Sequence, residues 1–259
     1  EINASTGEFL YQDSASVDGI IKTIDTLRIV DFDYGSHSYN SNCGWITGGP
    51  LSEGECRMWG NPVAEMMYET LRYFSGTKSP TPEFTYGTSS NDDNDLDLPK
   101  PDWLDPYTDG EDVNINGILD PGEDLNGNGI LDGFDYCAKP FMLVLSDINP
   151  TYDSDQLPGS NTNFSGAVSD PLAGINVETL ADTIANAEGI SGSHFMGQVA
   201  ADNDGACSPK TLSSFGDIRG LCPEEPTKQG SYYGASVAYH GNTEDIHPTA
   251  SELQNVSSY

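Results

Sequence analysis

Twenty-four consecutive residues, 112–135, carry two copies of a calcium-loop pattern, in which oxygen-bearing side chains alternate around a turn made by glycine. In the first copy the ligand positions are Asp112, Asn114, Asn116, Ile118 (through its carbonyl), Asp120 and Glu123. In the second copy they are Asp124, Asn126, Asn128, Ile130 (through its carbonyl), Asp132 and Asp135. Hard oxygen ligands of this kind select calcium, so the sequence predicts one Ca²⁺ in each loop.

The two loops directly follow one another, because Glu123 is next to Asp124 and leaves no room for a helix between them. They are therefore not paired EF-hands, and they resemble the tandem calcium repeats of thrombospondin type 3 and dockerin-like modules. Six carboxylates within 24 residues repel one another, and two Ca²⁺ ions would reduce the local charge from about −6 to about −2. We expect a structural staple that is saturated outside the cell, where such modules bind calcium at about 10⁻⁴ to 10⁻³ M.

Five cysteines supply the second chemical signal, and none is spaced as a zinc ligand. Two local disulfides, Cys43 with Cys56 and Cys207 with Cys222, are the most economical prediction. Each closes a loop of about 15 residues, worth about 3 kcal/mol in the chain-entropy model, and both suit an oxidising compartment. Cys137 is then left over, which fits a partner outside these residues. The alternative is five buried, reduced cysteines in a cytosolic protein.

The charge balance excludes several classes of function. With 41 acidic and 10 basic residues in 259, the net charge is −31. This leaves no basic surface for nucleic acid or for an anionic membrane. No apolar run approaches the length of a membrane span, so we expect no membrane insertion. The chain opens at Glu1 without a leader, and we expect a processed protein or part of a longer chain.

Local patterns predict the elements that must position these residues. Asn61 and Pro62 introduce a helix whose apolar residues recur at helical spacing as far as Phe74, and Asn176 introduces a second helix over 176–188. The apolar run Phe141–Leu145 predicts a central strand covered on both faces.

Other segments give weaker patterns. Residues 19–30 leave helix or strand undecided, 231–239 is a possible strand, and 77–109 reads as a surface loop rich in Pro, Ser, Asn and Asp. Alternation of strand, helix and long loop favours one α/β domain over 1–259, with an acidic insertion over 77–136.

Patterns of common catalytic sites are missing from this sequence. It contains no H-E-x-x-H, no G-x-S-x-G and no phosphate-binding G-x-x-x-x-G-K-[ST], and its four histidines lie far apart. We therefore predict that the protein is not an enzyme.

Long runs along nearly the whole chain resemble the PilC/PilY family of type IV pilus tip adhesins. The matching segments are Cys43-Gly-Trp45, 56–73, 98–107, 137–141, 146–150, 155–160, 216–222 and 230–233. The resemblance implies a von Willebrand factor A-like α/β domain, with a layered sheet and helices, of which these residues form a part. It also implies that a propeller domain follows in the complete protein.

The same resemblance raises the question of a second metal site. A-type domains bind a divalent ion through D-x-S-x-S, a later Thr, and an Asp at the end of a central strand. Asp147 matches the last position, and Asn61 stands where Thr is expected. The D-x-S-x-S motif does not occur in these residues, so the site is incomplete.

Together these observations predict an extracellular, non-enzymatic adhesion or biogenesis module at the tip of a type IV pilus, stabilised by calcium and disulfides. Its expected partners are pilin or minor pilins of the tip and a host or abiotic surface. One alternative is a structural subunit of an extracellular filament or surface layer. A less favoured hypothesis is a secreted hydrolase with structural calcium.

Overall fold

The structure is a computed structural model that describes part of the chain. The described residues are Thr6, 12–14, 17–18, 32–33, 38–39, 60–84, 103–112, 116–124, 127–133, 136–146, 149–164, Val168, 171–223 and 226–259. Three α-helices are described, α2 (Val63–Phe74), α4 (Val177–Glu188) and α5 (Tyr233–Thr243), with a 3₁₀ turn over Pro82–Phe84.

The strands pair two by two. Short antiparallel pairs join β1 (Gln12–Ser14) to β2 (Val17–Asp18) and β3 (Phe32–Asp33) to β4 (Ser38–Tyr39). A long antiparallel hairpin joins β6 (Gly192–Val199) to β7 (Asp202–Leu212). The strands β5 (Phe141–Met142) and β8 (Ser257–Ser258) are parallel. The described residues thus form a mixed α/β fold with small sheets, and no layered sheet of the A type is seen among them.

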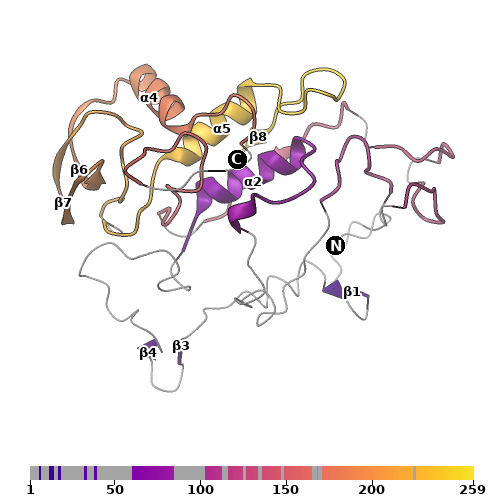
Figure 1. The fold of residues 1–259 in the computed structure, drawn as a ribbon, viewed down its shortest axis with the longest axis horizontal. Helices are drawn as coiled ribbons and strands as arrows, with labels where there is room; N and C mark the ends of the chain where they lie inside the picture. The colour runs from indigo at the N-terminus through magenta and orange to yellow at the C-terminus, as the bar shows by residue number, and fades with distance from the viewer. Residues whose placement is uncertain are drawn as a thin grey trace.

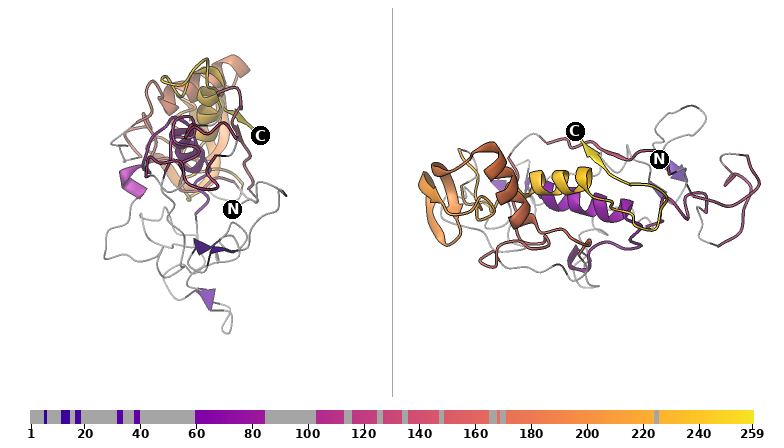
Figure 2. Two further views of the ribbon diagram at one scale, coloured as in Figure 1. Left: turned by 90° about the vertical axis from the view of Figure 1, so that its right-hand side faces the viewer. Right: turned by 90° about the horizontal axis from the view of Figure 1, so that it is seen from above.

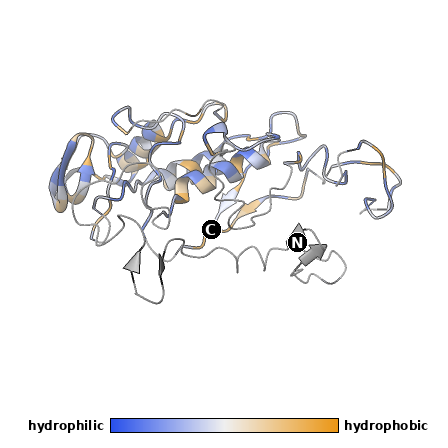
Figure 3. Ribbon diagram, turned by 60° about the horizontal axis from the view of Figure 1, so that its bottom comes forward, coloured by the Kyte–Doolittle hydropathy of each residue, from blue (hydrophilic) through white to orange (hydrophobic). Residues whose placement is uncertain are grey.

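The hydrophobic core lies between the three helices, with α5 against both α2 and α4 (Figures 1 and 2). Figure 3 shows hydrophobic and hydrophilic residues mixed along the helices, as expected for elements that bury one side. The buried apolar side chains from the helices are Ala64, Met67, Tyr68, Leu71, Val177, Ala181, Tyr233 and Val237. No helix in the described parts of the chain is both long and apolar enough to cross a membrane.

The two predicted helices are confirmed. Asn176 caps α4, because its side-chain oxygen accepts a hydrogen bond from the Thr179 backbone N–H at 2.9 Å, and Gly189 ends the helix in the left-handed conformation. The N-cap position of helix α2 is Pro62, which makes no side-chain hydrogen bond to the first turn. Instead the buried Asp153 lies at this end: it hydrogen-bonds Ala64 of α2 and accepts from the Ser231 N–H, just before α5, at 2.7 Å.

The possible strand over 231–239 is wrong, since Tyr233–Thr243 forms α5. Its buried residues, Tyr233, Ser236, Val237, His240 and Gly241, recur at helical spacing. Three of these five are polar or glycine, so a pattern based on apolar residues does not reveal the buried face.

The prediction that Phe141–Leu145 is covered on both faces is also wrong for the described residues. Met142 is buried and Val144 packs on the core, whereas Phe141, Leu143 and Leu145 are 61%, 71% and 85% exposed. The described strand has one partner, β8, and side chains alternate between the two faces of a strand. One face therefore meets the helices and the other is open.

Two further segments bear on the predictions. Residues 19–30 lie outside the described part of the chain. Within the described parts of the predicted surface loop over 77–109 there is a single 3₁₀ turn and otherwise no helix or strand, as predicted, but Thr81 and Asp105 are buried and not at the surface. The β6–β7 hairpin was not predicted. A bridge between Val199 and Ile218 extends it, over a small apolar cluster of Val199, Ile218 and Leu221.

Candidate functional site

The first of the two predicted calcium loops folds around the carboxylate of Asp112. Its Oδ1 accepts from the Asn116 N–H at 3.0 Å and its Oδ2 from the Gly117 N–H at 2.8 Å. Asn116 in turn donates from Nδ2 to Asp120 Oδ2 at 2.7 Å, and its Oδ1 accepts from the Ile118 N–H at 2.7 Å. Gly117 has φ +72°, a conformation that favours glycine, which explains the glycine in the pattern.

The second loop repeats this geometry. Asp124 Oδ2 accepts from the Gly129 N–H at 3.0 Å. Asn128 donates from Nδ2 to Asp132 Oδ2 at 2.7 Å, and its Oδ1 accepts from the Ile130 N–H at 2.7 Å. The sequence repeat of twelve residues is therefore also a structural repeat. The loops lie at the opposite end of the molecule from the β6–β7 hairpin (Figure 1).

A buried glutamate closes each loop, and the second of these was not predicted. Glu123 Oε2 accepts from the Asp120 N–H at 2.8 Å, and Glu111 Oε2 accepts from the Asp132 N–H at 3.2 Å. The Glu111 N–H also donates to the Asp132 carbonyl at 3.0 Å. Glu111 and Glu123 are 2% and 6% exposed. Glu111 directly precedes Asp112, just as Glu123 directly precedes Asp124. A repeat unit defined to start one residue earlier would therefore have included Glu111.

The donor atoms of the two loops suit a hard cation, since they are carboxylate and amide oxygens. Asp124 Oδ1 is buried and has no hydrogen-bond partner among the described residues, which leaves a negatively charged oxygen able to accept a ligand. Asn114, Asn126 and Asp135 lie outside the described residues. Within the described ranges no three His, Cys, Asp or Glu side chains are placed to hold an ion, so the calcium ligands stay a prediction.

A second polar cluster lies where β5 ends and α2 begins. Asn61 Nδ2 donates to Ser146 Oγ at 2.8 Å and to the Asn149 carbonyl at 3.4 Å, and its backbone N–H donates to Thr151 Oγ1 at 2.8 Å. Asn61 thus contacts the residue that precedes Asp147, although 85 positions separate Asn61 from Ser146. Asp147 itself is outside the described residues. The carboxyl end of a parallel strand is a common place for ligand binding in α/β proteins.

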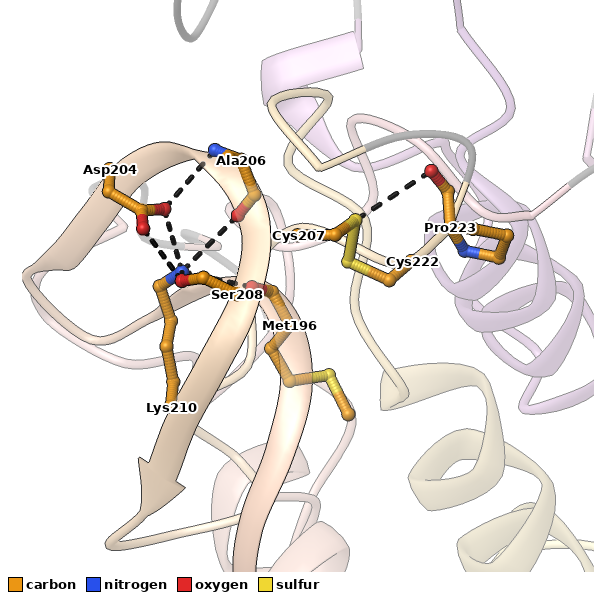
Figure 4. Close-up of a disulfide and its surroundings, with 8 residues drawn as sticks. All are labelled: Met196, Asp204, Ala206, Cys207, Ser208, Lys210, Cys222 and Pro223. Atoms are coloured by element: carbon orange, nitrogen blue, oxygen red, sulfur yellow. Dashed lines mark hydrogen bonds and ion pairs between the residues drawn. A yellow bond between two sulfur atoms is a disulfide. The ribbon is translucent and has the colours of Figure 1, made fainter.

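The predicted disulfide between Cys207 and Cys222 is present, with sulfur atoms 2.05 Å and Cα atoms 5.8 Å apart (Figure 4). It ties strand β7 to the segment that follows the bridge at Ile218. Cys137 is exposed, and Cys43 and Cys56 lie outside the described part of the chain.

A buried lysine holds the hairpin beside this disulfide. Lys210 is 2% exposed, and Nζ donates to Asp204 Oδ1 at 2.8 Å, Ser208 Oγ at 2.8 Å and the Met196 carbonyl at 3.0 Å (Figure 4). The hydrogen bond from Lys210 lowers the pKa of Asp204. These contacts join Met196 of β6 to Asp204, Ser208 and Lys210 of β7 around one ammonium group.

One histidine pairs with a carboxylate in the interior. His247 Nε2 lies 3.0 Å from Asp105 Oδ1, and its Nδ1 accepts from the Ala250 N–H at 3.0 Å. Because Nδ1 accepts, Nε2 carries the proton and donates it to Asp105. Both ring nitrogens are engaged and His247 is 1% exposed, so the pair fits a structural role.

Comparison with known proteins gives a consistent family match. The family described as "PilY1 homolog, second domain" matches residues 1–241. The protein named "Type IV pilus biogenesis factor PilY1 homolog" from Xylella fastidiosa (strain Temecula1 / ATCC 700964) is 45% identical over 250 residues. That match covers 93% of this chain and 16% of the relative, so the chain spans a small part of the relative's length. No solved structure matches the chain.

Proposed function

This chain belongs to the family of PilY1 homolog second domains, and we propose that it is a non-enzymatic, extracellular module of a type IV pilus protein that acts in adhesion at the pilus tip. The observation that carries the proposal is the 45% identity, over 93% of this chain, to a protein named as a type IV pilus biogenesis factor. The expected partners are pilin or minor pilins of the tip and the host or abiotic surface to which the pilus attaches.

The tandem loops are proposed to bind one Ca²⁺ each. The first ion would be held by Asp112, Asn114, Asn116, Ile118, Asp120 and Glu123, and the second by Asp124, Asn126, Asn128, Ile130, Asp132 and Asp135. Support comes from the repeated turn geometry and from the buried, unpartnered oxygen of Asp124. In the second loop Glu111 accepts the hydrogen bond that Glu123 accepts in the first loop. The sequence pattern alone would assign that place to Asp135.

Calcium and disulfides would give this module mechanical resistance. The loops expose Ile118 and Ile130, at 61% and 62%, so burial of apolar surface contributes little to their order. A bound ion and a covalent cross-link do not depend on a core, and each resists extension of the chain segment that it closes. Such cross-links would let a loop-rich domain at the pilus tip resist extension under load.

The fold is proposed to be part of a von Willebrand factor A-like domain. Support comes from the mixed α/β architecture, the parallel pairing of β5 with β8, and the contact of Asn61 with Ser146. Asp147 would then be one ligand of a divalent ion at the end of β5, with the D-x-S-x-S ligands supplied by another part of the polypeptide.

An attachment assay tests the proposed function. A strain whose full-length protein lacks residues 1–259 should still display pili, counted by electron microscopy, but should attach poorly to surfaces. Attachment at the wild-type level would refute the adhesion proposal. Assembly of the purified protein into filaments on addition of calcium, followed by light scattering, would favour the filament subunit instead. Turnover in a broad substrate screen would favour the secreted hydrolase.

Calcium uptake is tested separately by isothermal titration calorimetry of the wild-type chain and the double variant Asp112→Asn, Asp124→Asn. We expect uptake by the wild type and a large loss of affinity in the variant, because each substitution removes the first carboxylate of a loop. No uptake by the wild type in millimolar calcium would end the metal proposal and leave the adhesion proposal standing.

A further inference from the structure

Every asparagine–glycine bond of this sequence lies within the two predicted calcium loops. These bonds are Asn116–Gly117, Asn126–Gly127 and Asn128–Gly129, and no other asparagine of the chain is followed by glycine. A glycine after asparagine lets its backbone nitrogen attack the carbonyl carbon of the asparagine side chain, because no Cβ obstructs the approach. The product is a cyclic imide, which water opens to aspartate or to isoaspartate. The loops therefore carry the dipeptides that are most prone to deamidation.

The contacts around the first of these bonds favour the attack. The Gly117 N–H, which belongs to the attacking nitrogen, donates to Asp112 Oδ2 at 2.8 Å. The side-chain oxygen of Asn116, on the carbon that is attacked, accepts from the Ile118 N–H at 2.7 Å. A carboxylate beside the attacking nitrogen can take up its proton, and a backbone N–H at the carbonyl oxygen stabilises the negative charge that develops there.

The second loop repeats both contacts twelve residues further along the chain. The Gly129 N–H donates to Asp124 Oδ2 at 3.0 Å, and Asn128 Oδ1 accepts from the Ile130 N–H at 2.7 Å. Asn126 lies outside the described residues. A proton acceptor for the attacking nitrogen and a donor for the carbonyl oxygen are thus present at both asparagines that the structure describes.

Space and water are also available at both places. Asn116, Gly117, Asn128 and Gly129 are all exposed. A Cβ added to Gly117 or Gly129 would meet no atom within 4 Å, so nothing crowds the backbone where the imide ring would form. Water can therefore reach the imide and open it.

We propose that Asn116 and Asn128 are sites of self-catalysed deamidation. As the Gly117 nitrogen bonds to the Asn116 side-chain carbon, its proton passes to the Asp112 carboxylate. The bond from that carbon to Nδ2 then breaks, and Nδ2 leaves as ammonia with the proton, which water relays from Asp112. One water molecule adds to the imide at either carbonyl, so that Asn116 becomes aspartate or isoaspartate. Asp124 accepts the proton in the same way at Asn128.

Deamidation would weaken the hydrogen bonds that hold each loop. Asn116 Nδ2 donates to Asp120 Oδ2, and Asn128 Nδ2 donates to Asp132 Oδ2, both at 2.7 Å. Either product replaces the donor by a carboxylate, so an attraction becomes a repulsion between like charges. Isoaspartate also adds one carbon to the main chain, which displaces the ligand positions that follow it. The change is permanent, because the ammonia is lost.

Calcium should slow the reaction, and this part alone rests on the proposed function. Asp112 and Asn116 are among the proposed ligands of the first ion, as Asp124 and Asn128 are of the second. A carboxylate that is shared with a cation is a weaker base, and a side chain held as a ligand cannot turn toward the next backbone nitrogen. A chain kept without calcium should therefore age at these two asparagines, whereas a chain kept in calcium should not.

Peptide mapping by mass spectrometry tests the proposal on the purified full-length protein, incubated with a chelator at neutral pH. The mass gained when OH replaces NH₂ reports deamidation at each asparagine. We expect Asp112→Asn to slow deamidation of Asn116 several-fold and to leave Asn128 at the wild-type rate, and Asp124→Asn to do the reverse. In each variant the unchanged loop is the matched control. An unchanged rate at Asn116 in Asp112→Asn would overturn self-catalysis.

A second measurement needs no mutation. In guanidinium chloride the wild type loses the contacts of Asn116 and Asn128, and both should deamidate several-fold more slowly than in the folded protein. Rates that are equal or higher in the denaturant would overturn the proposal.

Incubation in millimolar calcium tests the protection separately. The wild-type rates at Asn116 and Asn128 should fall several-fold relative to the chelator. Equal rates in a protein that takes up calcium in calorimetry would overturn the protective effect and leave the calcium proposal standing. A protein that takes up no calcium would end the calcium proposal, and the variants in chelator would still decide whether the deamidation is self-catalysed.

Discussion

Replacement of Asp153 by Asn should change how the stability of the protein depends on pH. Asp153 is fully buried, its Oδ1 accepts from the Ser231 N–H at 2.7 Å, and its Oδ2 has no hydrogen-bond partner among the described residues. Burial raises the pKa of Asp153 from 3.8 to about 7, and the hydrogen bonds from Ser231 and Ala64 oppose that shift. Asn keeps the acceptor for Ser231 but cannot ionise.

The sign follows from proton binding. With a folded-state pKa above the unfolded one, native Asp153 keeps its proton between pH 4 and 7 while the unfolded chain has lost it. The contribution of this group to stability is thus fully present below about pH 4 and is lost as the pH rises through about 7. A difference of about three pH units, at about 1.4 kcal/mol per unit, gives at most about 4 kcal/mol. The amide of Asn also buries an N–H₂ where Oδ2 was, but that penalty of about 1 to 3 kcal/mol is independent of pH.

Urea unfolding at pH 4, 5, 6, 7 and 8 measures the effect. The free energy of unfolding of Asp153→Asn minus that of the wild type should rise by about 2 to 4 kcal/mol between pH 4 and pH 8. Asp202→Asn, which changes an exposed carboxylate on the hairpin, is the matched control and should give a nearly constant difference. A difference that is flat for Asp153→Asn, or that falls as the pH rises, would show that the ends of the two helices hold the carboxylate in its charged form.

Three further predictions concern a turn, a cross-link and a loop. Gly76→Ala should lower the free energy of unfolding by about 2 kcal/mol, because a Cβ there would lie 2.7 Å from atoms of the buried Asp–His pair and φ is +79°. Gly174→Ala is the control, because Gly174 has φ +81° but open space around it. Its loss of unfolding free energy, about 1 kcal/mol, measures the cost of the backbone conformation alone. Equal losses in the two variants would contradict the steric argument. Cys222→Ser should lower the free energy of unfolding, measured with urea under oxidising conditions, by about 3 kcal/mol. The variant and the wild type should be equally stable once the wild-type disulfide is reduced. A loss that persists under reduction would mean that packing of the Cys222 side chain, and not the disulfide, accounts for it. Glu111→Gln should weaken the binding of one of the two calcium ions, measured by calorimetry, whereas Glu83→Gln, at an exposed residue, should leave the binding of both unchanged. Unaltered binding of both ions by Glu111→Gln would mean that Glu111 does not support the second loop.

The elements that were predicted correctly are those whose determinants are local. Helix α4 has its cap at Asn176, its apolar spacing and its terminal Gly189 within fourteen residues of sequence, and all three act as expected. The Cys207–Cys222 bond likewise closes a short loop. In each case the interactions that fix the element can be inferred without knowing the rest of the fold.

The elements that were missed depend on partners far away in the chain. Helix α5 buries Ser236 and His240, and the Ser236 hydroxyl donates to the Val177 carbonyl at 2.7 Å, across 59 residues. A polar residue satisfied by a distant carbonyl looks exposed in a hydrophobicity pattern. The exposed side of β5 shows the opposite case, since an apolar run of five residues cannot reveal how many neighbouring strands are present.

The candidate calcium site combines both cases. The residues of each loop that bond within the loop, such as Asp112 with Gly117, follow from the pattern because they are at most five positions apart. The contact of Glu111 with Asp132 spans 21 positions and joins the start of the first loop to the second. A twelve-residue pattern is too short to include such a contact. The two loops therefore form one structural unit, and each copy of the pattern describes only part of it.

Different forces hold the two ends and the centre of this molecule, and that division predicts an order of unfolding. The centre has a continuous apolar core between α2, α4 and α5. Among the described residues, the hairpin has an apolar cluster of only three buried side chains. The Lys210 hydrogen bonds and the disulfide add the stabilisation that so small a cluster cannot provide. The loops over 111–132 are held by hydrogen bonds to carboxylates whose mutual repulsion persists unless a cation is bound. In hydrogen exchange a chelator should therefore release amides 116–132 first, a reductant should release β6 and β7, and neither should release α2 and α5. If α2 exchanged together with the loops on chelation, the calcium unit would belong to the same cooperative unit as the core, and the acidic insertion would be part of the folding domain.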